Sequence, residues 1–344
     1  MRALRLLFLC ALLLAATLLC CTHASDADAD ADAPNTPEPT SSASARDNDP
    51  TIQQVRGLRN AGMKLNDAKD FTGAIEKLRG AITLLHERVF GEGRHAVSDP
   101  AEISQDAALY AQILNDYGSV LIRAKQYDEA IEVLEDSVAM VDKIYGDSHP
   151  SLGLSLRSLA DAYMAKEKYQ KAINKYKTLR KHVKKGLGVT HEAYIEASLR
   201  IAEGYKKLGK KKKNLKVLKD AVKAQGGEIN GLTTGIAELY MELSTAHVAV
   251  NEIDDALRAA ETASAVFLQR DGEDTLTYAF SLNALAGVKM RQKKVDDAIE
   301  LLERAHKIAV KIYGDNDPIT QASAKTLREV KEYKLDLHAQ KDEL

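Results

Sequence analysis

Apolar residues along most of the chain recur at spacings of three and four, which is the pattern of an amphipathic helix. In the stretch that follows Pro150, one apolar stripe contains Leu152, Leu156 and Leu159, and a second begins at Tyr169 after a short polar break. Two stripes separated by so few residues predict two antiparallel helices joined by a tight turn.

The helical pattern is itself repeated at a period of 42 residues. Successive copies carry the pairs Ala130-Ile131, Ala172-Ile173, Asn214-Leu215, Ala256-Leu257 and Ala298-Ile299, and Ala74-Ile75 precedes them by 56. The extra 14 residues predict a longer loop over about 91–105. The chain is therefore predicted to hold six helical hairpins, over about 51–91, 106–146, 150–188, 191–230, 232–272 and 274–314.

A small residue stands twelve positions before each of these pairs, at Gly62, Gly118, Ala160, Ala202, Ser244 and Ala286. Small side chains at both places predict a close approach of the two helix backbones within each hairpin. Asn214 breaks the pattern, and the second helix of the fourth copy is expected to pack loosely.

These features resemble the tetratricopeptide repeat (TPR) family in its 42-residue form, as in kinesin light chains. The residues that carry the resemblance are the small pairs, Leu114, Leu156, Tyr240 and Leu282, Tyr127 and Tyr169, and the junction Gly146–Pro150. The resemblance implies an all-α, right-handed superhelical solenoid over 51–338 whose first helices line a groove for peptides or proteins. A helix over 318–338 is expected to cap it, burying Val330 and Leu335 among others.

The two ends of the chain carry targeting signals. Residues 1–24 predict a cleaved signal peptide, with an uncleaved anchor as the alternative, and residues 25–50 predict a disordered acidic, proline-rich linker. The tail 339–344 ends in Lys341, Asp342, Glu343 and Leu344, the retrieval signal for the endoplasmic reticulum (ER). We therefore expect residence in the ER lumen, recognition by the KDEL receptor, and no stable membrane insertion after cleavage.

The composition and the motifs of the chain limit the kinds of catalytic and metal-binding sites that it can hold. The 344 residues include three cysteines, all within the first 21, so thiol chemistry is absent from the expected mature chain. No catalytic, phosphate-binding or metal-binding motif is found, and His149 and His191 occupy equivalent junctions where a turn role is expected. The sequence predicts a protein that is not an enzyme and has no cofactor and no metal.

Two surfaces are candidates for partner binding. The first is the groove, where first helices place Arg59, Asn115, Arg157, Arg200 and Asn283. The second is a basic docking patch made of Lys206, Lys207, Lys210, Lys211, Lys212 and Lys213. It lies in the segment 166–223, where 19 basic residues face 5 acidic ones, although the chain as a whole has a net charge of -2. A lysine run at a helix start opposes the helix dipole, which suggests a use other than stability.

The predicted function is that of a non-catalytic interaction scaffold in the ER lumen, an adaptor or co-chaperone for luminal proteins, peptides or acidic segments, and not for nucleic acid. The alternative is a permanently bound, non-catalytic subunit of a luminal folding, modification or glycosylation complex. Gel filtration separates the two, because only the subunit keeps one stoichiometric partner.

Overall fold

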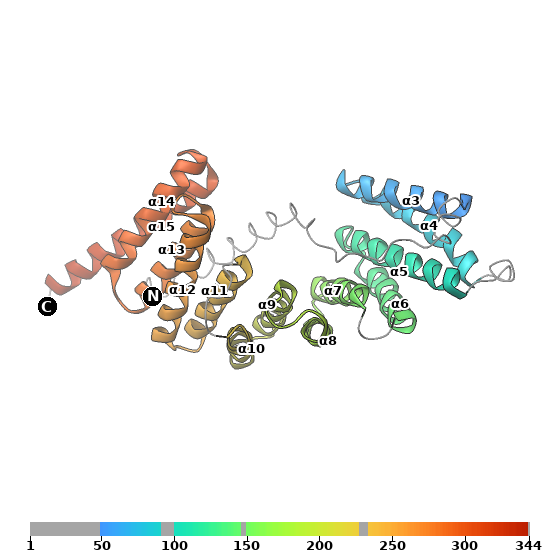
Figure 1. The fold of residues 1–344 in the computed structure, drawn as a ribbon. Coiled ribbons are helices and arrows are strands. Elements are labelled where there is room, and N and C mark those ends of the chain that lie inside the picture. Colours follow the sequence, from blue (N-terminus) through green and yellow to red (C-terminus); the bar gives the residue numbers. More distant parts are fainter. Residues whose placement is uncertain (1–48, 91–99, 146–148, 227–232, 343–344) are drawn as a thin grey trace. The chain divides into compact units, whose positions relative to one another are not determined.

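The computed structural model describes residues 49–90, 100–145, 149–226 and 233–342, and these residues form thirteen α-helices and no strand (Figure 1). The predicted signal peptide, nearly all of the linker and the last two residues of the tail lie outside the described residues. The helices are α3 (Pro50–Asp67), α4 (Phe71–Phe90), α5 (Pro100–Arg123), α6 (Tyr127–Tyr145), α7 (Pro150–Ala165), α8 (Tyr169–Gly186), α9 (Glu192–Lys207), α10 (Lys211–Ala224), α11 (Thr234–Ala249), α12 (Ile253–Asp271), α13 (Leu276–Arg291), α14 (Val295–Tyr313) and α15 (Pro318–Asp342).

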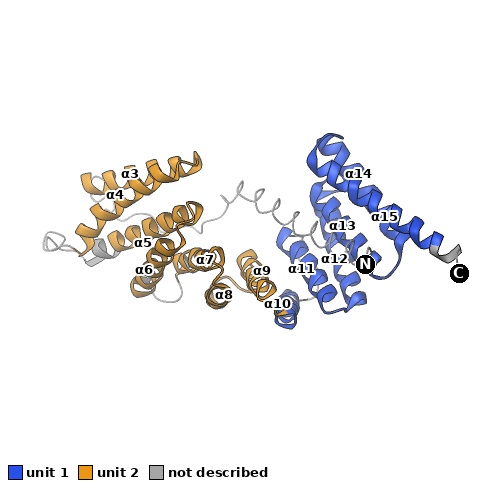
Figure 2. Cartoon of the chain, turned by 180° about the vertical axis from the view of Figure 1, so that it is seen from behind, with its two compact units in different colours: residues 1–33, 211–344 blue, residues 34–210 orange. Residues whose placement is uncertain are grey.

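The helices fall into two compact units, shown in Figure 2. In unit 2, α3 packs on α4, α5 on α6 and α7 on α8, and each second helix also contacts the first helix of the following pair, ending with α8 on α9. In unit 1, α11 packs on α12 and α13 on α14, and α10 and α15 pack at the two ends of this set. Each unit is a stack of TPR hairpins, which confirms the predicted all-α solenoid class.

The turn inside every hairpin repeats the 42-residue register. One residue per turn has a positive φ between 59° and 67°, and these residues are Lys69, Lys125, Glu167, Gly209, Asn251 and Lys293. The backbone N–H of the next residue donates to the carbonyl five positions earlier, as from Gln126 to Leu121 at 2.8 Å. This hydrogen bond defines a Schellman C-cap, which ends the first helix and starts the second.

The small residues allow the close helix approach that the sequence predicts. A Cβ added at Gly62 would lie 3.3 Å from the carbonyl oxygen of Ala74, and one added at Gly118 would lie 2.4 Å from Cγ of Leu134. At the equivalent point of the fifth hairpin, the hydroxyl of Ser244 donates to the carbonyl of Ala256 at 2.8 Å. In the first two hairpins, a side chain larger than that of glycine at this position would collide with the facing helix.

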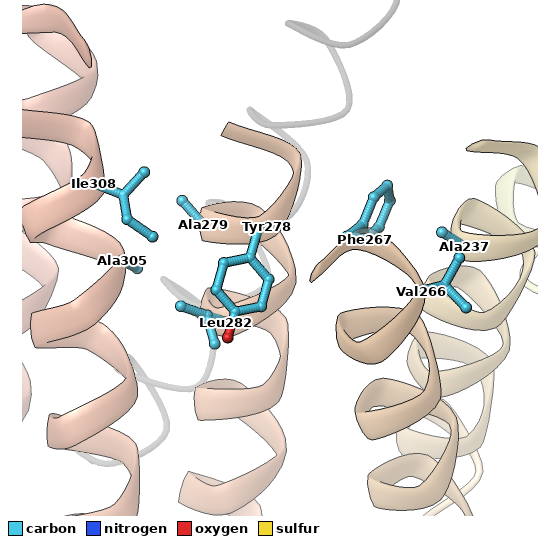
Figure 3. Packing of buried hydrophobic residues seen from close by; sticks show 8 residues of the cluster. All are labelled: Ala237, Val266, Phe267, Tyr278, Ala279, Leu282, Ala305 and Ile308. Carbon is cyan, nitrogen blue, oxygen red and sulfur yellow. The ribbon is translucent and has the colours of Figure 1, made fainter. Parts of the chain in front are cut away.

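A buried apolar cluster joins four consecutive helices of unit 1 (Figure 3). Ala237 of α11, Val266 and Phe267 of α12, Tyr278, Ala279 and Leu282 of α13, and Ala305 and Ile308 of α14 contribute to it. Each is at most 8% exposed. The core is thus formed between successive pairs as well as within them, which is how a repeat stack buries faces that no single hairpin could cover.

Four details differ from the sequence-based expectations. Helix α5 begins at Pro100, so the end of the predicted loop over 91–105 is helical, with the proline suited to a first helical turn. Helix α15 continues to Asp342 instead of ending near residue 338, and Leu335 is 69% exposed while Leu337 packs on the core. Helix α10, expected to pack loosely, buries Leu215, Val217, Leu218 and Ala221, and the buried Oδ1 of Asn214 lacks a hydrogen-bond partner.

Candidate partner-binding face of the repeats

An ion pair joins the first helices of the first two hairpins. Arg59 of α3, a predicted groove residue, donates from Nε to Oδ2 of Asp116 on α5 at 2.6 Å. The two side chains are 26% and 15% exposed. Burial raises the pKa of the Asp116 carboxyl, against the opposing effect of the Arg59 guanidinium. Arg59 thus neutralises a neighbour's charge and is not free to bind a partner without breaking this pair.

Two predicted groove asparagines lie on first helices in different units. Asn115 of α5 is half-buried, and its Oδ1 atom is buried without a hydrogen-bond partner. Asn283 of α13 is also half-buried. A buried carbonyl oxygen left unpaired costs about 1–3 kcal/mol, so an amide rotation that turns this oxygen toward a hydrogen-bond donor would be favourable.

The remaining two groove arginines are also held by acids. Nη2 of Arg157 on α7 donates to Oε1 of Glu196 on α9 at 2.6 Å, and both side chains are partly exposed. Arg200 of α9 donates to Glu203 at 3.2 Å and lies close to Asp161 and the buried Tyr176, which bond to each other. Burial would lower the pKa of Arg200, but these neighbours outweigh it and raise the pKa.

Sequence reasoning missed the acids that pair with these arginines. Glu203 stands three residues after Arg200, a helical neighbour spacing that could have indicated the pair. Asp116 lies 57 positions from Arg59, which is one position beyond the repeat interval between these copies, so the register alone would have pointed to Asn115 instead.

The predicted basic patch spans the boundary between the units, which falls between Lys210 and Lys211. Lys206 and Lys207 end α9, and Nζ of Lys210 donates to Gln170 of α8 at 3.2 Å. Lys211, Lys212 and Lys213 form the first turn of α10 and are all exposed. A single patch made of all six lysines therefore stays a prediction.

Two histidines cap helix starts. Nδ1 of His149 accepts from the N–H of Ser151 at 3.2 Å, and Nδ1 of His191 accepts from Ala193 at 3.1 Å, so both cap first helices as their junction positions suggest. His247 forms part of the one described group of possible metal ligands, with Glu252 and Asp255, whose ligand atoms lie within 4.8 Å of one another.

That group is better explained by hydrogen bonds within a turn. Nδ1 of His247 lies 2.7 Å from Oε2 of Glu252, which also accepts from Lys219 at 3.4 Å, while Asp255 pairs with Arg258. The hydrogen bond from His247 lowers the pKa of Glu252. Each carboxylate already has a cationic or histidine partner, so binding a metal would require displacing it.

On the first helices, the arginines described above form ion pairs, and the two junction histidines cap helix ends. Within the described part of the chain, no helix is long and apolar enough to cross a membrane. TPR proteins are generally non-catalytic scaffolds, and nothing in the described residues points to an enzyme.

Two segments match tetratricopeptide-repeat families, residues 109–185 and residues 281–319. The fold resembles a crystal structure of nearly identical TPR-like repeats of a kinesin light chain protein from Podosopora anserina, with a TM-score of 0.51, 24% identity, and coverage of 58% of this chain and 94% of that one. It also resembles BtubC (BKLC) from P. vanneervenii, with a TM-score of 0.54, 15% identity, and coverage of 69% and 92%. These similarities confirm the kinesin-light-chain-like TPR fold.

Two similar proteins match over most or all of their length. The RxLR effector protein SFI4 of Phytophthora infestans is 82% identical over 344 residues, covering 100% of both chains. The secreted RxLR effector protein RXLR-C07 of Plasmopara halstedii is 79% identical over 299 residues, covering 87% of this chain and 92% of that one.

Besides residues 2–5, the chain holds the letters R-x-L-R at Arg56, Gly57, Leu58 and Arg59, a four-residue pattern that the sequence reasoning passed over. These residues lie inside α3, and Arg59 is the partner of Asp116. With most of its length aligned to two such relatives, the protein belongs to the family of RxLR effector proteins that includes SFI4 and RXLR-C07, and it has a tetratricopeptide-repeat fold.

Proposed function

We propose that this protein is a non-catalytic scaffold that enters the secretory pathway and binds partner proteins through the first helices of its repeats. The observation that carries the proposal is the partly exposed side-chain amide of Asn115 on the first helix α5, a group that can pair with the backbone of a bound peptide once its unpaired Oδ1 turns outward. TPR stacks serve as protein-binding surfaces, which supports this assignment.

Replacing Asn115 with Ala separates binding from stability. We expect Asn115→Ala to reduce capture of crosslinked partners from cells by about threefold or more, since one hydrogen bond contributes about 1 kcal/mol. The thermal melt should be unchanged or slightly higher, because the orphaned oxygen is removed. Capture is measured by quantitative mass spectrometry after crosslinking, and the melt by circular dichroism.

The matched control is Asn174→Ala on α8, a second helix, where the exposed amide only accepts from Gln170. Equal capture by the wild-type chain and Asn115→Ala would overturn the proposed binding role of α5. A single stoichiometric partner on gel filtration would favour a fixed subunit of a larger complex over an adaptor with several partners.

Two destinations are proposed for the scaffold. The names of the relatives, which describe effectors and in one case a secreted protein, support export. The sequence Lys341–Leu344 supports retention in the ER lumen as an adaptor or co-chaperone, with the KDEL receptor as a further partner.

Removing the last four residues distinguishes the destinations. If retention operates, the full chain expressed in cultured eukaryotic cells stays with the cells, and deletion of 341–344 moves most of it to the medium. Immunoblots of both fractions measure the ratio, and a chain with two residues appended after Leu344 is the control, since the receptor reads a terminal signal. Equal secretion of the full and deleted chains would contradict retention and support export.

A further inference from the structure

Helix α10 carries an excess of positive charge that its own stability does not explain. Six lysines and one acid, Asp220, occupy its 14 residues, and all six lysines are exposed. Its first turn holds three of these lysines and no acid, whereas the second helices α6, α12 and α14 each begin with two acidic residues. Cations at a helix N-terminus are unfavourable, so this arrangement costs stability.

The lysines of one face line a cavity. Lys212, Lys216 and Lys219 follow one another at spacings of four and three, which places them on the same side of the helix. They surround a hollow of about 390 Å³ together with Leu215, Asp220, Val250 and Glu252. All of these residues belong to unit 1.

The charges in this cavity are not balanced. Lys219 donates to Glu252 at 3.4 Å, and Glu252 also bonds to His247. Among the described residues, Lys212 and Lys216 have no ion-pair partner. Two free ammonium groups therefore stand beside the apolar side chains of Leu215 and Val250.

We propose that this cavity, the α10 cavity, binds an acidic segment of a partner protein that carries an aliphatic side chain between its carboxylates. This rests on the proposed scaffold function and names the chemistry of one of its partners. Partner carboxylates would pair with Lys212 and Lys216, and the aliphatic side chain would rest on Leu215 and Val250.

The lining favours a peptide over other anions. The carboxylates of Asp220 and Glu252 repel any anion, but only a peptide also brings backbone N–H groups that they can accept from and an aliphatic side chain for Leu215 and Val250. A membrane surface is less suited, because α10 exposes no large apolar side chain that could enter a bilayer. The test therefore includes a lipid surface as an opposing outcome.

The experiment measures fluorescence anisotropy of a blocked peptide, Asp-Ala-Asp-Leu-Asp-Ala-Asp, titrated with the purified full chain. We expect Lys212→Glu with Lys216→Glu to weaken binding about tenfold, as for the loss of two exposed ion pairs and their replacement by like charges. The melt should not fall, because acids in the first turns of α10 suit the dipole better than lysine. An Asn-for-Asp peptide should not bind, and a Gly-for-Leu peptide should bind several-fold more weakly.

The matched control is Lys181→Glu with Lys184→Glu on α8, which makes the same charge change at exposed lysines of another helix. If the control variant loses peptide affinity by about twofold or less, the result supports specific binding in the α10 cavity. If it loses as much affinity as the Lys212 and Lys216 variant, general charge attraction explains the binding and the proposal is overturned. Binding to phosphatidylserine vesicles that depends on Lys212 and Lys216, without peptide binding, would also overturn it. If the Glu variants leave cellular capture intact while Asn115→Ala reduces it, the scaffold stands and the α10 cavity proposal fails.

Discussion

Gly118→Val is expected to lower the free energy of unfolding by about 3 kcal/mol, toward the upper end of overpacking effects in protein cores. A Cβ atom at this position would meet three side-chain carbons of Leu134 at 2.4, 2.6 and 2.9 Å. Leu134 is fully buried and so cannot turn away from the new group without displacing other core side chains. Chemical denaturation followed by circular dichroism measures the loss.

A glycine elsewhere in the same unit provides the control. Gly57 is exposed within α3, and a Cβ there would have no atom within 4 Å. Gly57→Ala should therefore stabilise the chain by about 0.5–1 kcal/mol through helix propensity. Adding Leu134→Ala to Gly118→Val should cost less than the sum of the two changes, because the truncated leucine leaves room for the valine. A neutral Gly118→Val variant would show that the two helices do not approach as closely as described.

Gly118 also illustrates what the sequence could predict. A period of 42 residues with small residues twelve apart is enough to predict the hairpins and the position of their closest contact, since only small side chains fit between touching backbones. The left-handed turn residues keep the same register but belong to several residue types, including lysine and glutamate, so no residue preference revealed them.

The candidate groove was less predictable than the fold. The register correctly indicated that Arg59 lies on a first helix, but its contact with Asp116 depends on the turn of each helix about its axis and on side-chain length. The same applies to Arg157 and Glu196, which lie on consecutive first helices. Sequence spacing identifies residues that share a face; it does not show which of them neutralise one another.

A further network was not predicted at all, because one of its members lies at the end of the expected linker. Asp49 caps α3 by accepting from the N–H of Thr51 at 2.8 Å and of Ile52 at 3.2 Å. Its other oxygen accepts from Nη1 of Arg88 on α4 at 2.6 Å. Nε of Arg88 donates to Asp106 on α5 at 2.5 Å, so one guanidinium ties together the starts of two hairpins.

Arg88→Met is expected to destabilise the chain by about 3 kcal/mol at pH 7, the lower end for removing one partner of a buried ion pair. The side chain of Arg88 is 18% exposed and that of Asp106 only 2%, so water cannot replace the lost guanidinium at Asp106. Methionine keeps most of the aliphatic packing, which confines the change to charge and hydrogen bonding. Urea denaturation at pH 7 gives the magnitude.

Arg79→Met on the same helix is the matched control. Arg79 is 61% exposed, pairs with Glu129, which is 40% exposed, and donates to the hydroxyl of Tyr117 at 3.0 Å. That hydroxyl keeps its own hydrogen bond to Glu129 at 2.6 Å, so the loss of Arg79 should cost no more than about 1 kcal/mol. Combining Arg88→Met with Asp106→Asn should recover part of the loss, because the buried carboxylate that needed the guanidinium is then neutral. Equal costs for Arg88→Met and Arg79→Met would contradict the described network.

The cost of Arg88→Met should also depend on pH in a defined direction. Although burial acts to raise it, the pKa of Asp49 is lowered below its usual 3.8 by hydrogen bonds from Arg88 and from the backbone of Ile52 and Thr51. A carboxyl whose pKa is lowered by folding stabilises the protein above its unfolded pKa, and this stabilisation is lost as the pH falls through the folded value. The difference between wild type and Arg88→Met should therefore be largest near pH 7 and shrink below about pH 4, as the carboxyl becomes protonated. Urea titrations at pH 7, 5 and 3.5 measure this trend, and a difference that grows on acidification would show that Arg88 does not act through the Asp49 carboxylate.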